Sequence, residues 1–211
     1  MEKDKYIYDN RYKFNEQWFD HNIPLWNQFF SQVNPLTDNV LEVGCYEGRA
    51  TIYLCNEVLS PGSNYYVVDT FAGSEEEDGM KGTVDRLKND ASIIEDNFLH
   101  NISFHKEINF NVNKGESQLI LPEMYYKSSP KFDLIFIDAS HRSDDTFVDA
   151  YYANKMLKKG GTIIFDDFKW KNPSDPKVVS SPEFGIRSFS TLYEQDYEIL
   201  HMGYQVILRK K

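Results

Sequence analysis

The chain has 211 residues, of which 33 are acidic and 23 are basic, so its formal net charge is −10 at pH 7. This length suits one domain with a full core, which the 15% aromatic residues can fill. The negative charge argues against a basic groove for nucleic acid and predicts a small substrate that is neutral or cationic, because a polyanion would be repelled.

Cysteine content and hydropathy indicate the cellular compartment of the protein. Two cysteines, Cys45 and Cys55, imply no disulfide framework. The N-terminal residues lack the apolar core of a signal peptide, and no apolar run approaches the ~18 residues of a membrane span. We therefore expect a cytoplasmic protein with no membrane partner.

Residues 1–35 are predicted to form an N-terminal arm and helical cap, ahead of a single domain over residues 36–211. Residues 1–13 are charged and tyrosine-rich without periodicity, which predicts a loose arm. Apolar residues then recur at helical spacing, which predicts a helix or a helix pair broken at Pro24. These residues are Phe14, Trp18, Phe19, Ile23, Leu25, Trp26, Phe29, Phe30 and Val33. The cap either packs on a sheet or forms a lid that shields a pocket from water.

Residues 39–54 predict a short apolar strand, a glycine turn and the start of a helix. Gly44 and Gly48 would let a ligand lie against the main chain, and the turn is expected to need positive φ. The next strand, 65–69, ends in Asp69, whose carboxylate can accept hydrogen bonds from both hydroxyls of a ribose. The turn is therefore a candidate nucleoside site.

The glycine spacing and the nearby charges restrict the class of ligand that this turn can bind. Gly-x-x-x-Gly is not the Gly-x-Gly-x-x-Gly pattern that places a pyrophosphate on a helix N-terminus. Glu42 and Asp69 bring two carboxylates to the site, which suits a ligand with a cationic centre and no phosphate. S-adenosylmethionine (SAM) has these properties.

Strands and helices are predicted to alternate along the rest of the chain. The polar, glycine-rich segment 70–82 is expected to be a mobile loop at the mouth of the cofactor site. The elements after it are predicted to be a helix at 83–99, a strand at 102–105, a helix at 116–126, a strand at 132–138, a helix at 144–157 and a strand at 162–165. Residues 158–161, Lys-Lys-Gly-Gly, are expected to terminate the helix at 144–157. The alternation predicts a doubly wound α/β sheet.

The C-terminus breaks this alternation, because residues 197–202 and 204–209 read as a hairpin around Gly203. Residues 40–48 and this hairpin together resemble the class I SAM-dependent methyltransferases over roughly residues 36–211. The resemblance implies a Rossmann-like domain with a seven-stranded, mostly parallel sheet in the order 3-2-1-4-5-7-6. It implies cofactor contacts at Glu42, Gly44, Cys45, Tyr46, Gly48, Asp69, Thr70, Phe71 and Asp138.

Two of the predicted strands end in acids, one at Asp138 and the other at Asp166 and Asp167. If these strands are neighbours, their backbones lie about 4.8 Å apart and the carboxylates can converge on one hard cation. The pattern resembles the divalent-cation-dependent O-methyltransferases of the catechol and macrocin types. The resemblance implies Mg²⁺ at Asp138, Asp166 and Asp167, and the loop at residues 68–73 looks more like the macrocin type.

The general base is left open by the sequence. Macrocin-type relatives carry a second acid two residues after the first, and Ser140 stands at that place here. His141 is the next candidate, because a histidine can take up a proton near neutral pH, and Asp138 is the second candidate for a catalytic role. A structural hydrogen bond at the strand-to-helix turn is the alternative role for His141.

The leading hypothesis is a SAM-dependent enzyme that methylates a hydroxyl of a small molecule, such as a sugar, polyol or phenol, with help from Mg²⁺. One alternative is a metal-independent N- or O-methyltransferase, and another is a SAM- or nucleoside-binding protein without turnover. A nicotinamide oxidoreductase is more distant, because the expected glycine pattern is missing. Phe168, Trp170 and the loop 172–184 are expected to shape acceptor choice, and a homodimer is left open.

Overall fold

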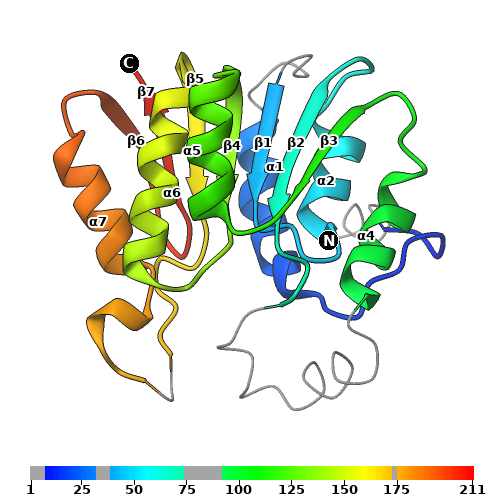
Figure 1. Cartoon of the computed structure of the whole chain (residues 1–211), viewed down its shortest axis with the longest axis horizontal. Helices are drawn as coiled ribbons and strands as arrows, with labels where there is room; N and C mark the ends of the chain where they lie inside the picture. Colours follow the sequence, from blue (N-terminus) through cyan, green and yellow to red (C-terminus); the bar gives the residue numbers. More distant parts are fainter. Residues whose placement is uncertain (1–7, 32–38, 74–91, 173–174) are drawn as a thin grey trace.

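The computed structural model describes residues 8–31, 39–73, 92–172 and 175–211. Seven strands form one sheet in the order β3-β2-β1-β4-β5-β7-β6, which confirms the predicted order (Figure 1). The strands are β1 (Asn39–Val43), β2 (Asn64–Asp69), β3 (Asn109–Lys114), β4 (Phe132–Ile137), β5 (Leu157–Phe165), β6 (Tyr197–Met202) and β7 (Val206–Lys210). Strands β1 to β5 pair in parallel, whereas β7 is antiparallel to both β5 and β6.

Helices cover both faces of this sheet. They are η1 (Trp18–Asn22), α1 (Ile23–Phe30), α2 (Arg49–Glu57), α4 (Ile93–Ile102), α5 (Ser117–Lys127), α6 (Ser143–Met156), η3 (Val178–Ser180) and α7 (Glu183–Leu192). Residues of α1, α2 and α4 share one buried cluster with the sheet. Residues of α5, α6 and α7 share the other, and α6 and α7 lie in front of the sheet in Figure 1. The fold therefore has three layers, as expected for a doubly wound sheet.

The N-terminal cap is part of the core. Its helix pair divides at Asn22, so Pro24 lies in the first turn of α1, where a proline is tolerated. The Trp26 ring is fully buried and lies 5.0 Å from the ring of Phe136, in the middle of the sheet. We conclude that α1 packs on the face of the sheet.

The arm before the cap is docked, so the prediction of a loose arm is wrong for residues 8–13. The Tyr12 hydroxyl lies 2.9 Å from Nε2 of His105. The main chain of Lys13 exchanges two hydrogen bonds with the Asn101 side chain, at 2.7 and 2.8 Å. The Tyr8 hydroxyl donates to the main-chain oxygen of Arg49. These are specific polar contacts, which residue periodicity does not reveal; residues 1–7 lie outside the described residues.

The predicted third strand at 102–105 is wrong. Ile102 ends α4, and the strand next to β2 is Asn109–Lys114. This strand lies at the sheet edge, and asparagines alternate along it with the partly exposed Phe110 and Val112. An edge strand with this composition has no apolar run to mark it.

The boundary between α6 and β5 also differs from the prediction. Strand β5 begins at Leu157, directly after the last residue of α6, so residues 158–161 belong to the strand. Gly160 has φ +78°, and the pairing with β4 shifts register between Phe132 and Leu134. An irregular strand start of this kind resembles a glycine helix terminus in sequence.

The remaining predicted helices agree with the structure in part. The described part of the predicted helix 83–99 is helical in α4, whereas residues 83–91 lie outside the described residues, as does most of the predicted loop 70–82. The prediction at 116–126 corresponds to α5, and α7 has no counterpart in the predicted elements. None of the described helices is long and apolar enough to cross a membrane.

Candidate functional site

The glycine turn after β1 touches the chain that follows β4. Gly44 and Gly48 have φ of +83° and +82°, which confirms the expected positive φ. A Cβ atom on Gly44 would lie 2.1 Å from the main-chain oxygen of Asp138. Glycine is therefore required at position 44 both by the close approach of neighbouring backbone and by its positive φ. This contact places Asp138 beside the turn.

Asp69 organises the same turn through its carboxylate. Its Oδ2 accepts hydrogen bonds from the main-chain N–H groups of Cys45 at 2.6 Å and Tyr46 at 2.8 Å. Its Oδ1 accepts from the main-chain N–H of Phe71 at 2.6 Å. Because a carboxylate has about four acceptor directions, about one is left on Oδ1 for a further donor.

Three of the predicted cofactor residues, Glu42, Cys45 and Phe71, have buried side chains. Glu42 is 1% exposed, and its Oε2 accepts from the hydroxyls of Thr51 at 2.5 Å and Tyr65 at 2.7 Å. Burial raises the pKa of Glu42 to about 7, although these two hydrogen bonds oppose the rise. Phe71 is also buried, and its ring lies 5.3 Å from that of Phe98. Thr70 is partly exposed at the end of β2.

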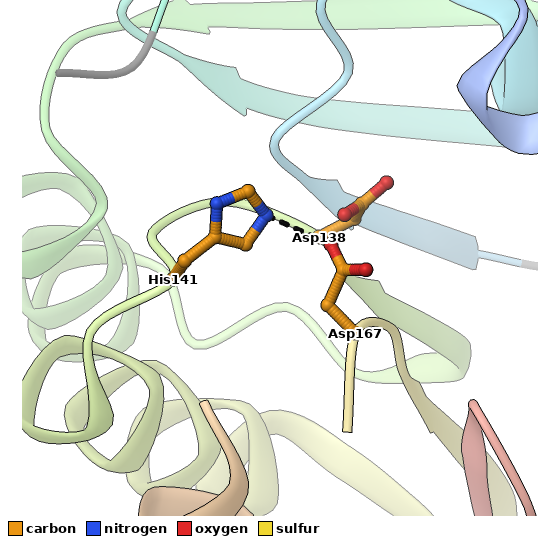
Figure 2. A group of neighbouring side chains, drawn as sticks. All are labelled: Asp138, His141 and Asp167. Carbon is orange, nitrogen blue, oxygen red and sulfur yellow. Dashed lines mark hydrogen bonds and ion pairs between the residues drawn. The ribbon is translucent and has the colours of Figure 1, made fainter. Parts of the chain in front are cut away.

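The acids after β4 and β5 lie close together, as the sequence predicts. Ile137 pairs with Phe165 across the two strands, and the main-chain N–H of Asp166 donates to the oxygen of Ile137. One ligand atom from each of Asp138, His141 and Asp167 lies within 4.8 Å of the others. Figure 2 shows these three side chains converging.

Asp166 is not a member of this group and is held by buried amides. Its Oδ2 accepts from Nδ2 of Asn22 at 2.8 Å and from Nε2 of Gln205 at 3.0 Å, while its Oδ1 accepts from the N–H of Asp167. The Trp26 indole N–H donates to Oε1 of the same Gln205 at 2.7 Å. Burial, with the charge of Asp167, raises the pKa of Asp166 to about 6 against these donors.

Asp167 accepts one hydrogen bond on each oxygen. Its Oδ2 lies 2.7 Å from Nε2 of His141, and its Oδ1 accepts from the Tyr204 hydroxyl at 2.6 Å. Burial tends to raise the pKa of Asp167, but the contacts with His141 and Tyr204 outweigh it and hold that pKa below its ordinary value. In contrast, burial and then the charges of Asp166 and Asp167 raise the pKa of Asp138 well above its ordinary value.

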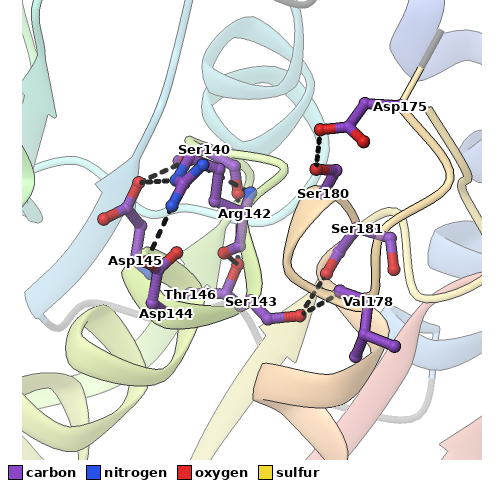
Figure 3. Close-up of polar contacts among 10 residues, drawn as sticks. All are labelled: Ser140, Arg142, Ser143, Asp144, Asp145, Thr146, Asp175, Val178, Ser180 and Ser181. Atoms are coloured by element: carbon purple, nitrogen blue, oxygen red, sulfur yellow. Dashed lines mark hydrogen bonds and ion pairs between the residues drawn. The ribbon is translucent and has the colours of Figure 1, made fainter.

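The loop that carries His141 is fixed by polar contacts at the start of α6 (Figure 3). The Thr146 hydroxyl lies 2.7 Å from the main-chain oxygen of Arg142 and 3.1 Å from that of Ser140, and the Ser140 hydroxyl donates to Asp145 at 2.9 Å. The Ser143 hydroxyl contacts the main-chain oxygen of Val178 in η3 at 3.0 Å. Ser140 therefore forms hydrogen bonds within the loop. These bonds hold the backbone that carries the His141 ring.

Aromatic and charged side chains extend from this site toward η3. The His141 ring stacks on that of Trp170, with centroids 4.3 Å apart and planes 25° apart. A cavity of about 350 Å³ is lined in part by Lys171, which follows Trp170 in the chain, and by Phe184 and Arg187. Sequence reasoning names Phe168, Trp170 and the loop 172–184 as acceptor determinants. Phe168 is buried in the cluster that α5, α6 and α7 share with the sheet, and the assignment of acceptor choice stays a prediction.

Sequence reasoning missed three residues of the acid site: Asn22, Tyr204 and Gln205. Asn22 is a buried polar residue between the apolar positions Phe19 and Ile23 of the cap. Gln205 is fully buried directly before the apolar strand β7. A polar residue within an apolar stripe is the one sequence signal for such a partner, because buried polar groups are normally hydrogen-bonded.

The chain was compared with known protein families and with curated proteins. Over residues 41–168, the chain matches the protein family described as "Methyltransferase domain". No curated protein matches the chain by sequence.

Three solved structures illustrate the similarity in fold. An O-methyltransferase from Bacillus cereus in complex with SAH is 21% identical with a TM-score of 0.54, covering 82% of this chain and 74% of that chain. CalS11, a TDP-rhamnose 3′-O-methyltransferase of calicheamicin biosynthesis, is 14% identical with a TM-score of 0.52, covering 92% and 80%. MycE of the mycinamycin pathway, solved with Mg, SAH and mycinamycin VI, is 15% identical with a TM-score of 0.57, covering 98% and 52%.

Proposed function

Because the chain belongs to the methyltransferase-domain family, we propose that it is a SAM-dependent O-methyltransferase that acts on a hydroxyl of a small molecule, with a divalent cation at Asp138, His141 and Asp167. One observation carries the proposal: the three possible ligands converge at the edge of the sheet where Gly44 meets Asp138. Donor and acceptor would then meet in one opening at the carboxyl ends of the strands.

The turn between β1 and α2 fits the proposed cofactor. SAM supplies a methyl group already activated on a sulfonium. The remaining acceptor direction on Asp69 can take one ribose hydroxyl, and a second would require release of the N–H of Cys45, Tyr46 or Phe71. Asp69 and Asp138 carry carboxylates near the expected cationic centre, and they favour it electrostatically when ionised.

The group at the ends of β4 and β5 fits a divalent cation. The two carboxylates are ligands that suit Mg²⁺ or Mn²⁺, whereas the imidazole suits a first-row transition metal, and the three ligand atoms lie within 4.8 Å of one another. A bound cation would orient an acceptor hydroxyl and lower its pKa. The raised pKa of Asp138 comes first from its burial and then from the charges of Asp166 and Asp167, and these neighbouring charges would also attract a cation. Asp166 would support this group from behind through Asn22 and Gln205.

A second candidate, methyl transfer without a metal, is favoured by the contact between His141 and Asp167. In this arrangement the Asp167 carboxylate orients the His141 imidazole at 2.7 Å, as in base–orienter pairs of other enzymes. The same Nε2 atom cannot bind a cation and donate to Asp167 at once. Cation binding would therefore replace this hydrogen bond, whereas metal-independent catalysis would keep it.

The acceptor is proposed to be a small hydroxyl compound such as a sugar, polyol or phenol. CalS11 and MycE, two similar structures, belong to pathways that modify small molecules. The formal charge of −10 disfavours a polyanionic acceptor at long range. Trp170, stacked on His141, offers an apolar ring face on which a sugar or phenol ring can lie.

A methylation assay separates these functions. Purified protein is incubated with SAM and a panel of sugars, polyols, phenols and amines, with EDTA or with Mg²⁺, and product is detected by mass spectrometry. The proposal expects an O-methylated product that EDTA abolishes and Mg²⁺ restores. Full activity in EDTA would favour the metal-independent enzyme. SAM binding without product from any acceptor would favour a non-catalytic binding protein.

A further inference from the structure

Two consecutive residues of the C-terminal hairpin donate hydrogen bonds to the two consecutive acids that follow β5. Tyr204 donates its hydroxyl to Oδ1 of Asp167 at 2.6 Å, and Gln205 donates its amide to Oδ2 of Asp166 at 3.0 Å. The hairpin therefore contacts both acids after β5, although it is remote from them in sequence. The resemblance to class I methyltransferases uses this hairpin only as part of the sheet. A role for the hairpin at the site goes beyond that resemblance.

The main chain fixes the hairpin turn against the end of β5. The N–H of Phe168 donates to the oxygen of Tyr204 at 2.9 Å, and the N–H of Gly203 donates to the oxygen of Gln205 at 2.8 Å. Strand β7 then begins at Val206, which pairs with Phe165. The main chain of Tyr204 is thus bonded to the segment that carries the acids.

Each carboxylate oxygen of Asp167 has its own hydrogen-bond partner. A phenol that meets a carboxylate must donate, so Oδ1 is committed to Tyr204. Oδ2 is then directed to Nε2 of His141, in the group that includes Asp138. Without the phenol, rotation of the carboxylate about its last torsion would be broad, because such torsions have shallow barriers.

We propose that Tyr204 is a positioning residue: its hydroxyl holds Oδ1 of Asp167, so that Oδ2 points at the place where a divalent cation binds. This inference rests on the proposed cation site. It assigns the hairpin a role that ligand-supporting hydrogen bonds have in other metal sites, where loss of such a partner weakens metal affinity about 10- to 100-fold.

The exposure of Tyr204 argues against a purely structural role. The side chain is 36% exposed, and its ring meets the His21 ring edge-on at 5.1 Å. Replacement by phenylalanine would keep that ring contact and remove only the hydroxyl. Tyr197 on β6 offers a matched control, since it is buried and its hydroxyl donates to Oδ1 of Asn154 at 2.9 Å, away from the acids.

Direct titration with Mn²⁺ tests the proposal without an acceptor or an activity assay. Free Mn²⁺ is followed by its electron paramagnetic resonance signal for the wild type, Tyr204→Phe and Tyr197→Phe, and the thermal midpoint of each is recorded. We expect Tyr204→Phe to bind Mn²⁺ about tenfold more weakly with a near wild-type midpoint. We expect Tyr197→Phe to bind Mn²⁺ as the wild type does and to unfold at a lower temperature.

The outcomes separate this inference from the proposed function. If the wild type binds Mn²⁺ and Tyr204→Phe binds it equally well, the positioning role is wrong while the cation site stands. If both tyrosine variants weaken binding alike, the effect comes from general loss of stability and the positioning role is again wrong. If the wild type binds no Mn²⁺, the proposed cation site itself is wrong, and the role of Tyr204 falls with it.

Discussion

The main-chain oxygen of Asp138 lies so close to Gly44 that a Cβ atom on the glycine would be 2.1 Å from it. Through this contact, the turn after β1 lies directly beside the segment that carries Asp138. A change at Gly44 should therefore disturb both the cofactor turn and the acid group.

Gly44→Ala should strongly destabilise the protein. The new methyl group would clash with backbone that cannot rotate away, and alanine is strained at φ +83°. We expect a loss well above the ~1–2 kcal/mol of backbone strain alone, measured by denaturant unfolding. Gly62→Ala is the matched control, because Gly62 has φ +92° but nothing within 4 Å of a Cβ atom. Equal losses in the two variants would show that the close approach to Asp138 is unimportant.

Asp69→Asn should weaken SAM binding. The amide can still accept on one side, but its NH₂ group would face either the N–H groups of Cys45 and Tyr46 or the N–H group of Phe71, so the turn loosens. We expect the dissociation constant for SAM to rise on the order of tenfold or more by calorimetry, since each such bond is worth ~1.5–3 kcal/mol. Asp133→Asn makes the same charge change at the start of β4, where Asp133 pairs with Lys158. Unchanged affinity in Asp69→Asn would remove the proposed role of this carboxylate.

Asp149 on α6 should make stability depend on pH. It is fully buried, and its carboxylate oxygens have no hydrogen-bond partner among the described residues, although the Ser117 hydroxyl lies close enough to lower the pKa. Burial raises the pKa of Asp149 to about 7, from an ordinary value near 4. The folded state thus keeps a proton that the unfolded state releases, and wild-type stability falls as pH rises from about 4 to about 7.

Asp149→Asn removes this ionisation. Relative to the wild type, the variant should gain free energy of unfolding between pH 4 and pH 7, by on the order of 2 kcal/mol or more at the upper end. Urea unfolding at pH 4.5 and pH 8 measures the difference. A constant offset between the two proteins at both pH values would show that Asp149 does not hold a proton in the fold.

The two acids after β5 should respond differently to the same substitution. Asp167→Asn removes charge from the converging group and should weaken Mn²⁺ binding about 100-fold or more. Asp166→Asn should mainly lower thermal stability, because its new NH₂ group would face the amides of Asn22 and Gln205. Titration with Mn²⁺ and thermal unfolding of both variants provide the comparison. Stronger loss of Mn²⁺ binding in Asp166→Asn would restore Asp166 as the main ligand.

Sequence patterns predicted the elements whose residues are buried on both sides. The apolar run in β4 and the glycine turn after β1 are defined by local chemistry, and their places in the structure agree with prediction. The edge strand β3 was missed because Asn109, Asn111 and Asn113 give it no apolar signal. Local pattern is weakest where a strand has only one neighbour.

The candidate site was predictable only in part, for a related reason. Acids at strand ends reveal Asp138, Asp166 and Asp167, because parallel strands bring their carboxyl ends to one edge. Which oxygen faces a cation depends on partners distant in sequence, such as Asn22 on η1 and Tyr204 on the hairpin. Such pairings arise from tertiary contacts and leave no spacing to read.

The central claim is that a SAM site and a cation site share one opening, with the cation held by Asp138, His141 and Asp167. A crystal grown with SAM and Mn²⁺, measured at a wavelength where manganese scatters anomalously, tests it most directly. We expect an anomalous peak bonded to these three side chains, beside SAM on the Gly44 turn. SAM bound there with no anomalous peak near Asp167 would contradict the account.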